Sequence, residues 1–369
     1  MRRSRRNQKI TCEKHVADIT QHLLDQIATA CNSNQTLSIK AGGSKAFMGR
    51  PIQADCQLDL SGHSGIVSYH PVELVMTARA GTPLVELEAA LAEHNQMLAF
   101  EPPRFAGRGT LGGTLATNLS GPSRPWWGSI RDHILGVNLI NGFAERLRFG
   151  GQVMKNVAGY DLSRLQAGAF GALGVMTEIS FKVSPQPAAL RTLKFHLSES
   201  EAIEQMNYFA SQPKPLSAAY WQSGVLYVRL AGAASAVDTT AKHWGGDEIG
   251  TPEATAIWQT LQDQQLAIFN ASTLWRFSVR SNAPSLNLNG DTLINWGGAE
   301  RWVAADAELA EMAQVAETAG GQVSLYRGGD RKGEVLHPMV PELQRLQQRI
   351  KQAVDPKGIF NPGRGYSWL

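Results

Sequence analysis

The chain has 369 residues, of which 43% are hydrophobic and 18% are charged, as in a globular protein large enough for two domains. Its formal charge is +3, and five basic residues stand among the first nine positions without an acid, so the remainder is slightly acidic. This balance disfavours a nucleic-acid-binding body. We interpret residues 1–14 as a basic flexible tail, solvated or in contact with anionic lipid.

No apolar run approaches the roughly 18 residues of a membrane span, and no apolar core of a signal peptide follows the basic start. We therefore expect a cytoplasmic protein. Cys12, Cys31 and Cys56 lack Cys-x-x-Cys spacing, which argues against an iron–sulfur cluster ligated by this chain alone. We interpret them as reduced, small apolar side chains.

Apolar periodicity predicts a small α+β unit at the start of the chain. Its predicted elements are a helix with Val16, Ile19, Leu23 and Ile27 on one face and strands at 37–40, 57–60, 66–69 and 74–78. Thr82 and Pro83 have the pattern of an N-cap and first residue of a second helix. Further strands are predicted between Ile134 and Val183, where apolar and polar residues alternate after Gly174.

Pro185 and Pro187 mark a boundary, after which glycine clusters become fewer and strands alternate with helices. The predicted strands lie at 193–196, 225–230, 275–279 and 301–303, and the predicted helices at 199–211, 234–244, 253–265 and 306–319. A last helix carries Leu343, Leu346, Ile350 and Val354 on one face. We therefore expect a separate sheet-and-helix cap.

Glycines are concentrated between Gly112 and Val183, at points where apolar strands end. Glycine lets a backbone approach a neighbour closely or turn at positive φ. A large flat ligand lying against the backbone explains this concentration, whereas a glycine-rich sandwich or barrel would not explain Asn118, Tyr160 and Asp161 between the bends.

A second glycine-containing loop follows the first predicted strand, at Ala41, Gly42, Gly43, Ser44, Lys45 and Ala46. Successive backbone N–H groups in a tight glycine turn form an anion-binding concavity that suits a diphosphate. The alternative is a plain turn, and the glycine-rich stretch downstream favours the ligand site.

The segment Gly107-Arg-Gly-Thr-Leu-Gly112 matches the dinucleotide pattern Gly-x-Gly-x-x-Gly, with Asp132 at about the spacing of its acid. We reject a nicotinamide site because Glu101-Pro-Pro103 stands where a strand is required. After Gly113 we expect small strand-like residues in place of a helix. The chain has no Walker A loop.

The order of these motifs resembles the FAD-binding domain of the vanillyl-alcohol oxidase/PCMH flavoproteins, and more specifically the FAD-binding E subunits of bacterial glycolate oxidases. The similar motifs are Gly42-x-x-Lys45, Glu101-Pro-Pro103, Gly121-Pro-x-Arg-Pro125, the segment 148–164, Trp296-Gly-Gly-Ala299 and Phe360-Asn-Pro-Gly-Arg364. The resemblance implies an α+β fold with a PCMH-type FAD-binding domain of two α+β subdomains at 15–187. It further implies a cap domain at 188–338 and a C-terminal segment, 339–369, that returns to the FAD domain.

The resemblance also implies the cofactor-binding residues. Besides the loop 41–46, they are Thr110, Gly112, Gly113, Thr117, Asn118, Gly121, Gly128, Lys155, Asn156, Gly174, Val175 and Asn361. Lys155 and Asn156 would lie near the pyrimidine edge of the flavin, unless Lys155 is a surface charge. Tyr160 and Asp161 are interpreted as structural.

Many covalent members of the superfamily carry a flavin-linked histidine in the loop after the first strand, and this chain has Ser44-Lys45 there. We therefore expect non-covalent FAD. Trp126 and Trp127 could pack against the flavin ring or be buried at an interface.

The implied function is that of a subunit of a glycolate (2-hydroxy acid) dehydrogenase that oxidises glycolate to glyoxylate. In such glycolate oxidase complexes a larger FAD-binding subunit and an iron–sulfur subunit carry electrons onward at the cytoplasmic face of the inner membrane. Two alternatives remain: a non-catalytic assembly subunit that keeps the flavin fold, and a free-standing flavin oxidoreductase acting on another substrate.

Relatives that oxidise 2-hydroxy acids carry a histidine- and acid-rich metal site in the C-terminal half. Here His337 is the sole histidine beyond residue 243, so we expect no metal site and assign no catalytic residue. Arg276, Arg301 and Arg327 are candidates to bind a substrate carboxylate, or are surface or ion-pair residues.

Overall fold

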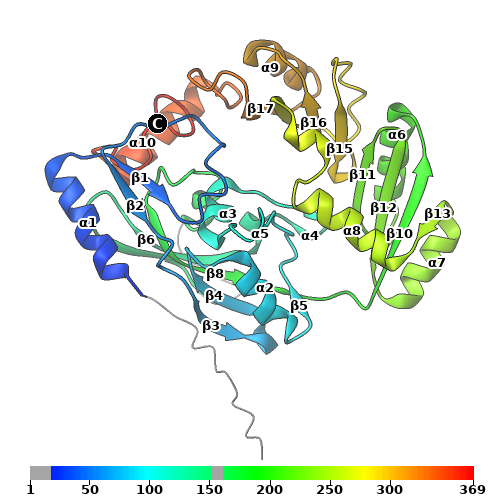
Figure 1. The fold of residues 1–369 in the computed structure, drawn as a ribbon, viewed down its shortest axis with the longest axis horizontal. Coiled ribbons are helices and arrows are strands. Elements are labelled where there is room, and N and C mark those ends of the chain that lie inside the picture. The colour runs from blue at the N-terminus through cyan, green and yellow to red at the C-terminus, as the bar shows by residue number, and fades with distance from the viewer. Residues whose placement is uncertain (1–17, 152–160) are drawn as a thin grey trace, which may run out of the picture.

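The computed structural model describes residues 18–151 and 161–369. The molecule has two parts that lie side by side (Figure 1). The N-terminal part contains a two-stranded and a five-stranded sheet, and the cap is built on an eight-stranded sheet. The last helix and the C-terminal chain lie against the N-terminal part (Figure 1).

The first unit packs one helix on two short parallel strands. It comprises α1 (Thr20–Ser33), β1 (Leu37–Lys40) and β2 (Cys56–Asp59). Leu23 and Ile27 of α1 are fully buried, as their helical spacing predicted. β1 also accepts the returning C-terminal chain, since the Leu37 N–H donates to the Ile359 carbonyl at 2.7 Å.

The second sheet is antiparallel, with the strand order β3-β4-β8-β6-β7. Its strands are β3 (Ile66–His70), β4 (Val75–Arg79), β6 (Ile134–Ile140), β7 (Arg146–Gly150) and β8 (Val175–Lys182), and β5 (Gln96–Met97) pairs separately with β9 (Ser184–Pro185). The helices of this part are α2 (Leu84–Ala92), α3 (Leu111–Thr117), α4 (Arg124–Trp127) and α5 (Ile130–His133). One core unites the sheet, α2, α3 and α5 with α1 and the C-terminal chain.

Two details of this part differ from the sequence prediction. The helix α2 begins at Leu84 with Pro83 as its N-cap, because the Thr82 hydroxyl donates to the Arg79 carbonyl at 2.7 Å and does not cap the helix. The residues after Gly112 form the helix α3, where we expected strand-like structure; Thr110 caps it by accepting a hydrogen bond from the Gly113 N–H. One of the two reasons for rejecting a nicotinamide-binding motif at Gly107–Gly112 is therefore wrong, because a helix does follow it. The other reason holds, because the structure has no strand between Phe100 and Gly109, ahead of the motif.

The cap sheet is antiparallel throughout, with the order β13-β10-β12-β11-β15-β16-β14-β17. Its strands are β10 (Ala189–His196), β11 (Leu216–Gln222), β12 (Val225–Gly232), β13 (Asp247–Ile249), β14 (Thr273–Ser278), β15 (Thr292–Asn295), β16 (Glu300–Ala304) and β17 (Gln322–Gly328). Its helices are α6 (Glu199–Ala210), α7 (Ala234–Trp244), α8 (Thr251–Gln262) and α9 (Leu309–Thr318). The sequence pattern did not predict β11, whose residues are almost all buried and so show no alternation.

The C-terminal helix α10 (Pro341–Val354) leads back to β1. At its end Lys351 donates to Asp355 at 2.8 Å and to the carbonyls of Ala172 and Phe360, so a buried ion pair fixes the return. Asn361 then accepts a hydrogen bond from the Ile39 N–H and donates one to the Phe170 carbonyl.

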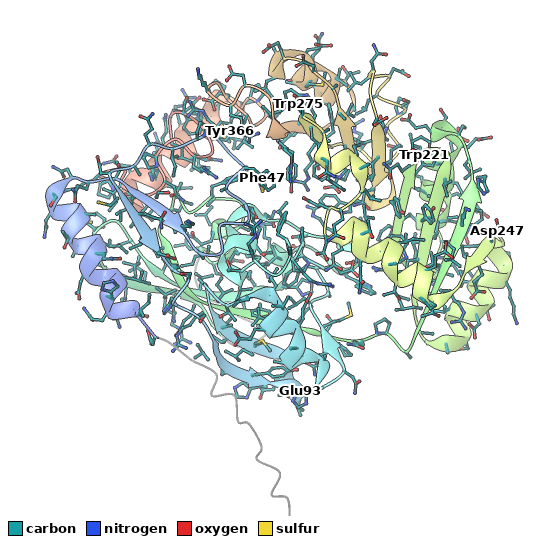
Figure 2. The ribbon with its side chains drawn as sticks, viewed as in Figure 1. Phe47, Glu93, Trp221, Asp247, Trp275 and Tyr366 are labelled. Atoms are coloured by element: carbon teal, nitrogen blue, oxygen red, sulfur yellow. The ribbon has the colours of Figure 1, made fainter. Side chains whose placement is uncertain are left out.

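The two parts meet across an interface of aromatic and charged side chains. Phe47 lies centrally between them in Figure 2, with its ring centroid 5.3 Å from that of Tyr326 in β17. Trp126 packs on the cap core, and Trp127 lies beside the Arg229 guanidinium, so both tryptophans belong to this interface. Among the described residues, no helix is both long and apolar enough to cross a bilayer.

Candidate functional site: a glycine-lined cavity in the N-terminal part

A cavity of about 230 Å³, partly open to solvent, lies between β1, α3 and the C-terminal return. Concave, partly enclosed sites of this kind hold cofactors and other small molecules. Most of the residues predicted to bind a cofactor line it, namely Ala41, Gly42, Gly43, Ser44, Lys45, Ala46, Thr110, Gly112, Gly113, Thr117, Gly174 and Asn361. Segments more than 300 residues apart in the chain thus meet at one site.

The glycines of this cavity have two distinct functions. Gly43 has φ +65° and would direct a side chain toward open space, where the Cε atom of Lys40, 3.3 Å away, is its sole close neighbour. A side chain on Gly42 would instead collide with the Arg108 carbonyl, and one on Gly112 would press on Ala80 at 2.7 Å. Gly42 and Gly112 therefore permit the chain to pack on itself, whereas Gly43 leaves room for a ligand.

Gly113 faces the same space from α3. A Cβ atom there would lie 3.6 Å from the Nζ atom of Lys45 and 3.1 Å from the Thr110 hydroxyl. The bare backbone of Gly113 therefore lies beside the Lys45 ammonium group, and a ligand that enters here meets a positive charge.

Lys45 is the charged group of this cavity. Burial lowers the pKa of its ammonium group to about 8. Its Nζ atom lies 3.3 Å from the Ser44 hydroxyl and 5.0 Å from the centroid of the Phe105 ring, and no described carboxylate lies within ion-pair distance of it. A half-buried cation without a counter-charge fits an anionic ligand such as a diphosphate, which would supply the missing negative charge.

Four of the predicted residues lie outside the cavity lining. Asn118 is the C-cap of α3, Val175 is fully buried in β8, and Gly128 follows α4 at φ +86°. A side chain on Gly121 would collide with the Glu101 carbonyl, and the Gly121 carbonyl accepts a hydrogen bond from the Trp296 indole at 2.8 Å. At Gly121 the absence of a side chain therefore permits close packing between segments.

Lys155, Asn156 and Tyr160 lie outside the described residues. Asp161 accepts hydrogen bonds from the Ser163 hydroxyl at 2.8 Å and the Arg164 N–H at 3.1 Å, so it holds a turn, as its structural interpretation requires.

Sequence reasoning missed several residues of the cavity, among them Phe170, Gly171, Met176 and Arg364. Arg364 donates to the carbonyls of Ala46 at 2.8 Å and Arg50 at 3.1 Å, so it fixes the end of the glycine loop. Gly171 has φ +73°, and a side chain there would press on the Asn361 amide at 2.8 Å. The sequence signal that could have identified Gly171 is its place in the glycine-rich stretch between Gly112 and Val183.

The three candidate arginines of the cap have different environments. Arg301 is fully buried and donates to the carbonyls of Gly298, Pro284 and Ala283, which makes it structural. Arg276 pairs with Glu300 at 2.7 Å.

Arg327 lies over the Phe47 ring, 4.4 Å from its centroid, and its buried Nε atom has no hydrogen-bond partner within the described chain. Arg327 therefore offers a buried Nε–H donor that no described residue uses, and it lies over Phe47, next to the glycine loop.

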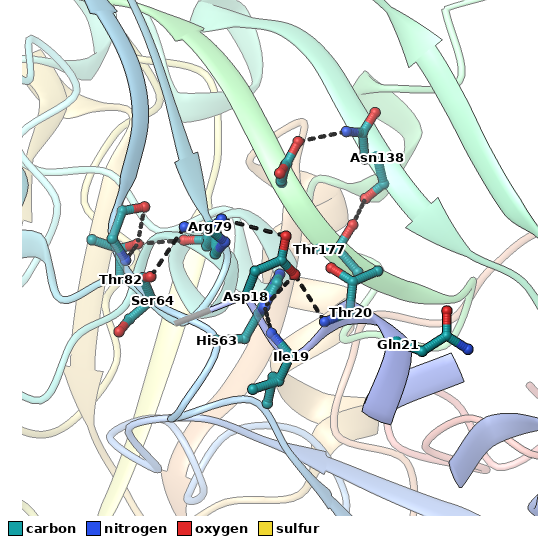
Figure 3. Close-up of polar contacts among 12 residues, drawn as sticks. Asp18, Ile19, Thr20, Gln21, His63, Ser64, Arg79, Thr82, Asn138 and Thr177 are labelled. Atoms are coloured by element: carbon teal, nitrogen blue, oxygen red, sulfur yellow. Dashed lines mark hydrogen bonds and ion pairs between the residues drawn. The ribbon is translucent and has the colours of Figure 1, made fainter. Parts of the chain in front are cut away.

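A separate polar cluster anchors the start of α1 (Figure 3). Asp18 pairs with Arg79 at 3.4 Å, and hydrogen bonds from the hydroxyl and N–H of Thr20 lower its pKa to about 2. The fully buried His63 accepts a hydrogen bond from the Ile19 N–H at 3.3 Å, and burial lowers the pKa of its ring. None of these residues lines the cavity. Within the described ranges, no three His, Cys, Asp or Glu side chains are grouped to hold a metal ion.

Comparison with known proteins shows the family to which this chain belongs. The family described as "FAD binding domain" matches residues 16–150. The chain is 45% identical over 353 residues to glycolate oxidase subunit GlcE of Escherichia coli (strain K12), covering 95% of this chain and 99% of that protein. A D-lactate dehydrogenase of Archaeoglobus fulgidus is 25% identical over 340 residues, 77% of this chain and 75% of that one.

A further relative, glycolate oxidase subunit GlcD of Bacillus subtilis, is 28% identical over 173 residues, which are 46% of this chain and 36% of that protein. Among solved structures, p-cresol methylhydroxylase with substrate bound has a TM-score of 0.70 at 15% identity, covering 94% of this chain and 87% of that one. This last likeness shows the fold.

The fold and the family match therefore define an FAD-dependent oxidoreductase with a PCMH-type FAD-binding domain and an additional sheet-rich domain. The chain belongs to the family of the glycolate oxidase subunit GlcE, and its cofactor is FAD.

Proposed function

We propose that this chain is the FAD-binding subunit of a glycolate (2-hydroxy acid) dehydrogenase complex, in which electrons pass to a partner iron–sulfur subunit. The proposal is supported most directly by the half-buried, unpaired Lys45 beside the bare backbone of Gly113. This arrangement fits the diphosphate of FAD. We further propose domain boundaries at 15–187, 188–338 and 339–369.

Bound FAD would supply the acceptor for a hydride from C2 of the substrate. The residues of the chain would hold the cofactor without a covalent bond. The loop 41–46 presents backbone N–H groups, Lys45 neutralises the diphosphate, and Arg364 keeps the loop in place through the Ala46 and Arg50 carbonyls. The remaining predicted residues, including Lys155 and Asn156, keep their proposed place in cofactor binding.

Substrate orientation would come from the cap. Arg327 has a free Nε–H and a guanidinium plane held on Phe47, which suits a carboxylate such as that of glycolate. Removal of the hydroxyl proton requires a base, and no described histidine lies in the cavity lining. We propose that a second protein of the complex completes this part of the site.

The proposed partners are the larger FAD-binding subunit and the iron–sulfur subunit of glycolate oxidase. The relatives GlcE and GlcD are named as subunits of a glycolate oxidase, which supports a multi-subunit assembly. We place the complex on the cytoplasmic face of the inner membrane, attached through its partners.

Co-expression tests this proposal. The chain purified with the larger FAD-binding subunit and the iron–sulfur subunit should reduce an artificial electron acceptor with glycolate, and omission of the chain should abolish the reaction. Acid precipitation of the purified chain should leave the yellow cofactor in the supernatant. Flavin that stays on the denatured chain would overturn the non-covalent assignment. Full activity without the chain would support a dispensable assembly subunit.

A further inference from the structure

The glycine loop 41–46 continues directly into a contact with the cap. Its residues line the cavity, whereas the next residue, Phe47, lies between the two parts of the molecule (Figure 2). The Phe47 ring packs edge-on against Tyr326 of β17, with 5.3 Å between the ring centroids. The cavity and this contact are joined by a tight turn, in which the Met48 N–H donates to the Lys45 carbonyl at 3.1 Å. One short segment of chain thus borders both the cavity and the cap.

The face of the Phe47 ring supports the Arg327 guanidinium, whose central carbon lies 4.4 Å from the ring centroid. No hydrogen bond or ion pair joins this guanidinium to another described residue, and its buried Nε atom is without a partner there. Arginine stacks on an aromatic face through its planar, delocalised charge. The Tyr326 hydroxyl donates to the Gln264 side chain at 2.6 Å and so fixes the ring on which Phe47 packs. The position of Phe47 therefore sets the plane in which Arg327 presents its N–H groups.

The other end of the same segment is tied to the chain that follows Arg327. Arg331 donates two hydrogen bonds to the Gly49 carbonyl, at 2.9 and 2.8 Å. Arg50 in turn donates to the Gly333 carbonyl at 2.8 Å. The stretch that carries Arg327 is therefore attached to the loop through backbone carbonyls as well as through the stacked ring, and a shift of the loop displaces both contacts.

The near end of the segment is the part of the cavity that fits an anion. Lys45 and Ala46 line it directly before Phe47. A diphosphate bound by the backbone N–H groups and by Lys45 would fix the two residues that precede the ring. Cofactor binding and the orientation of Arg327 are then linked through one side chain. Such a linkage is reciprocal, so a carboxylate held by Arg327 strengthens FAD binding by the same factor by which FAD strengthens carboxylate binding.

We propose that Phe47 is a positioning residue, through which the binding of FAD orients Arg327 for the substrate carboxylate. The proposal rests on the proposed function, because it states how the cofactor site prepares the substrate site of that reaction. Phe47 acts through Arg327 and is assigned no contact with the reacting atoms. A side chain that only filled the interface would need apolar bulk at this position, whereas positioning requires an aromatic face.

The test compares Phe47→Leu, which keeps apolar bulk and removes the aromatic face, with Phe47→Tyr, which keeps the face. The matched control is Phe195→Leu, at a half-buried phenylalanine of β10 that packs on Phe209 in the cap core. One readout is kcat and KM for glycolate in the assembled complex at saturating FAD. The other is the dissociation constant of oxalate for the full chain with and without FAD, measured by calorimetry; oxalate has no C–H bond, so no turnover occurs. The melting temperature reports on folding in each variant.

We expect Phe47→Leu to raise the KM for glycolate by about three- to tenfold with kcat nearly unchanged, as when a stacked guanidinium loses its support. Phe47→Tyr and Phe195→Leu should behave as the wild type. Wild-type chain should bind oxalate more tightly with FAD than without it, and Phe47→Leu should reduce this advantage by a similar factor. In the Arg327→Met background Phe47→Leu should add no further effect, because it acts through Arg327.

Wild-type KM and oxalate affinity in Phe47→Leu, in a complex that oxidises glycolate, would overturn the positioning role and leave the proposed function intact. Additive effects of Phe47→Leu and Arg327→Met, or an equal loss in Phe47→Tyr, would assign Phe47 to packing alone and overturn it too. If the assembled wild type did not oxidise glycolate, the proposed function would fail. The oxalate titrations would still decide the link, since equal affinity of the wild-type chain with and without FAD would contradict it.

Discussion

The Glu101 carboxylate and the Arg229 guanidinium lie 2.8 Å apart and join the FAD-binding domain to the cap. Their side chains are 13% and 9% exposed, so the pair is largely withdrawn from water. Glu101 also accepts a hydrogen bond from the Ser123 N–H, and Arg229 donates to the Ser217 hydroxyl. The pair is therefore tied to the segment at Ser123 in one domain and to the paired strands β11 and β12 in the other.

Removal of either charge of this pair should destabilise the folded protein. The variant Glu101→Gln leaves Arg229 buried without a counter-charge, so we expect the free energy of unfolding to fall by about 3 kcal/mol. Urea denaturation followed by tryptophan fluorescence measures this. The double variant Glu101→Gln/Arg229→Met should recover part of the loss, because no buried charge then remains. Equal stability of wild type and Glu101→Gln would show that the pair contributes nothing at the interface.

Gly43→Val should abolish FAD retention, because a β-branched side chain there enters the cavity at the glycine loop. The matched control is Gly224→Val in the β11–β12 turn, where φ is +82° and nothing lies within 4 Å of an added Cβ. Both variants carry similar backbone strain, but the control should keep its flavin. The ratio of flavin to protein absorbance in each purified variant decides the outcome. Stoichiometric FAD in Gly43→Val would place the diphosphate elsewhere.

Lys45→Met should weaken FAD binding by about 10- to 100-fold. This is the loss of affinity expected when one charge-assisted hydrogen bond to the ligand is removed. The apoprotein should not lose stability at pH 7, because the substitution removes an unpaired, partly buried charge.

The affinity should also depend on pH. In the apoprotein the lysine loses its proton near pH 8, so wild-type affinity should fall as the pH rises from 7 to 9, whereas that of Lys45→Met should not. Titration of apoprotein with FAD across this range measures both effects. A parallel fall in both proteins would assign the pH dependence to another group.

Arg327→Met should raise the KM for glycolate of the assembled complex by about 10- to 100-fold with little change in kcat, because a carboxylate contact acts on substrate and transition state alike. Arg280→Met, at an exposed position of the cap, is the control and should behave as wild type. An unchanged KM in Arg327→Met would remove Arg327 from the substrate site.

The sequence predicted the local elements well, because periodicity and turn residues are local signals. The helix face of Leu23 and Ile27 and the strand Leu37–Lys40 are examples, and both are present in the structure. The sequence could not predict that Gly42 and Gly43 have different roles. The Arg108 carbonyl that excludes a side chain at Gly42 is distant in the chain. The exposed leucines of α10 share a helical face that sequence alone would assign to a core.

The central claim is that this chain binds FAD and oxidises glycolate only within its complex. Anaerobic mixing of the FAD-loaded chain with glycolate tests it most directly, with the loss of the flavin absorbance band as the readout. We predict no appreciable bleaching by the isolated chain and rapid bleaching by its complex with the larger FAD-binding and iron–sulfur proteins. Bleaching of the isolated chain at the rate of the complex would contradict the claim, and would mean that the catalytic base lies within this chain.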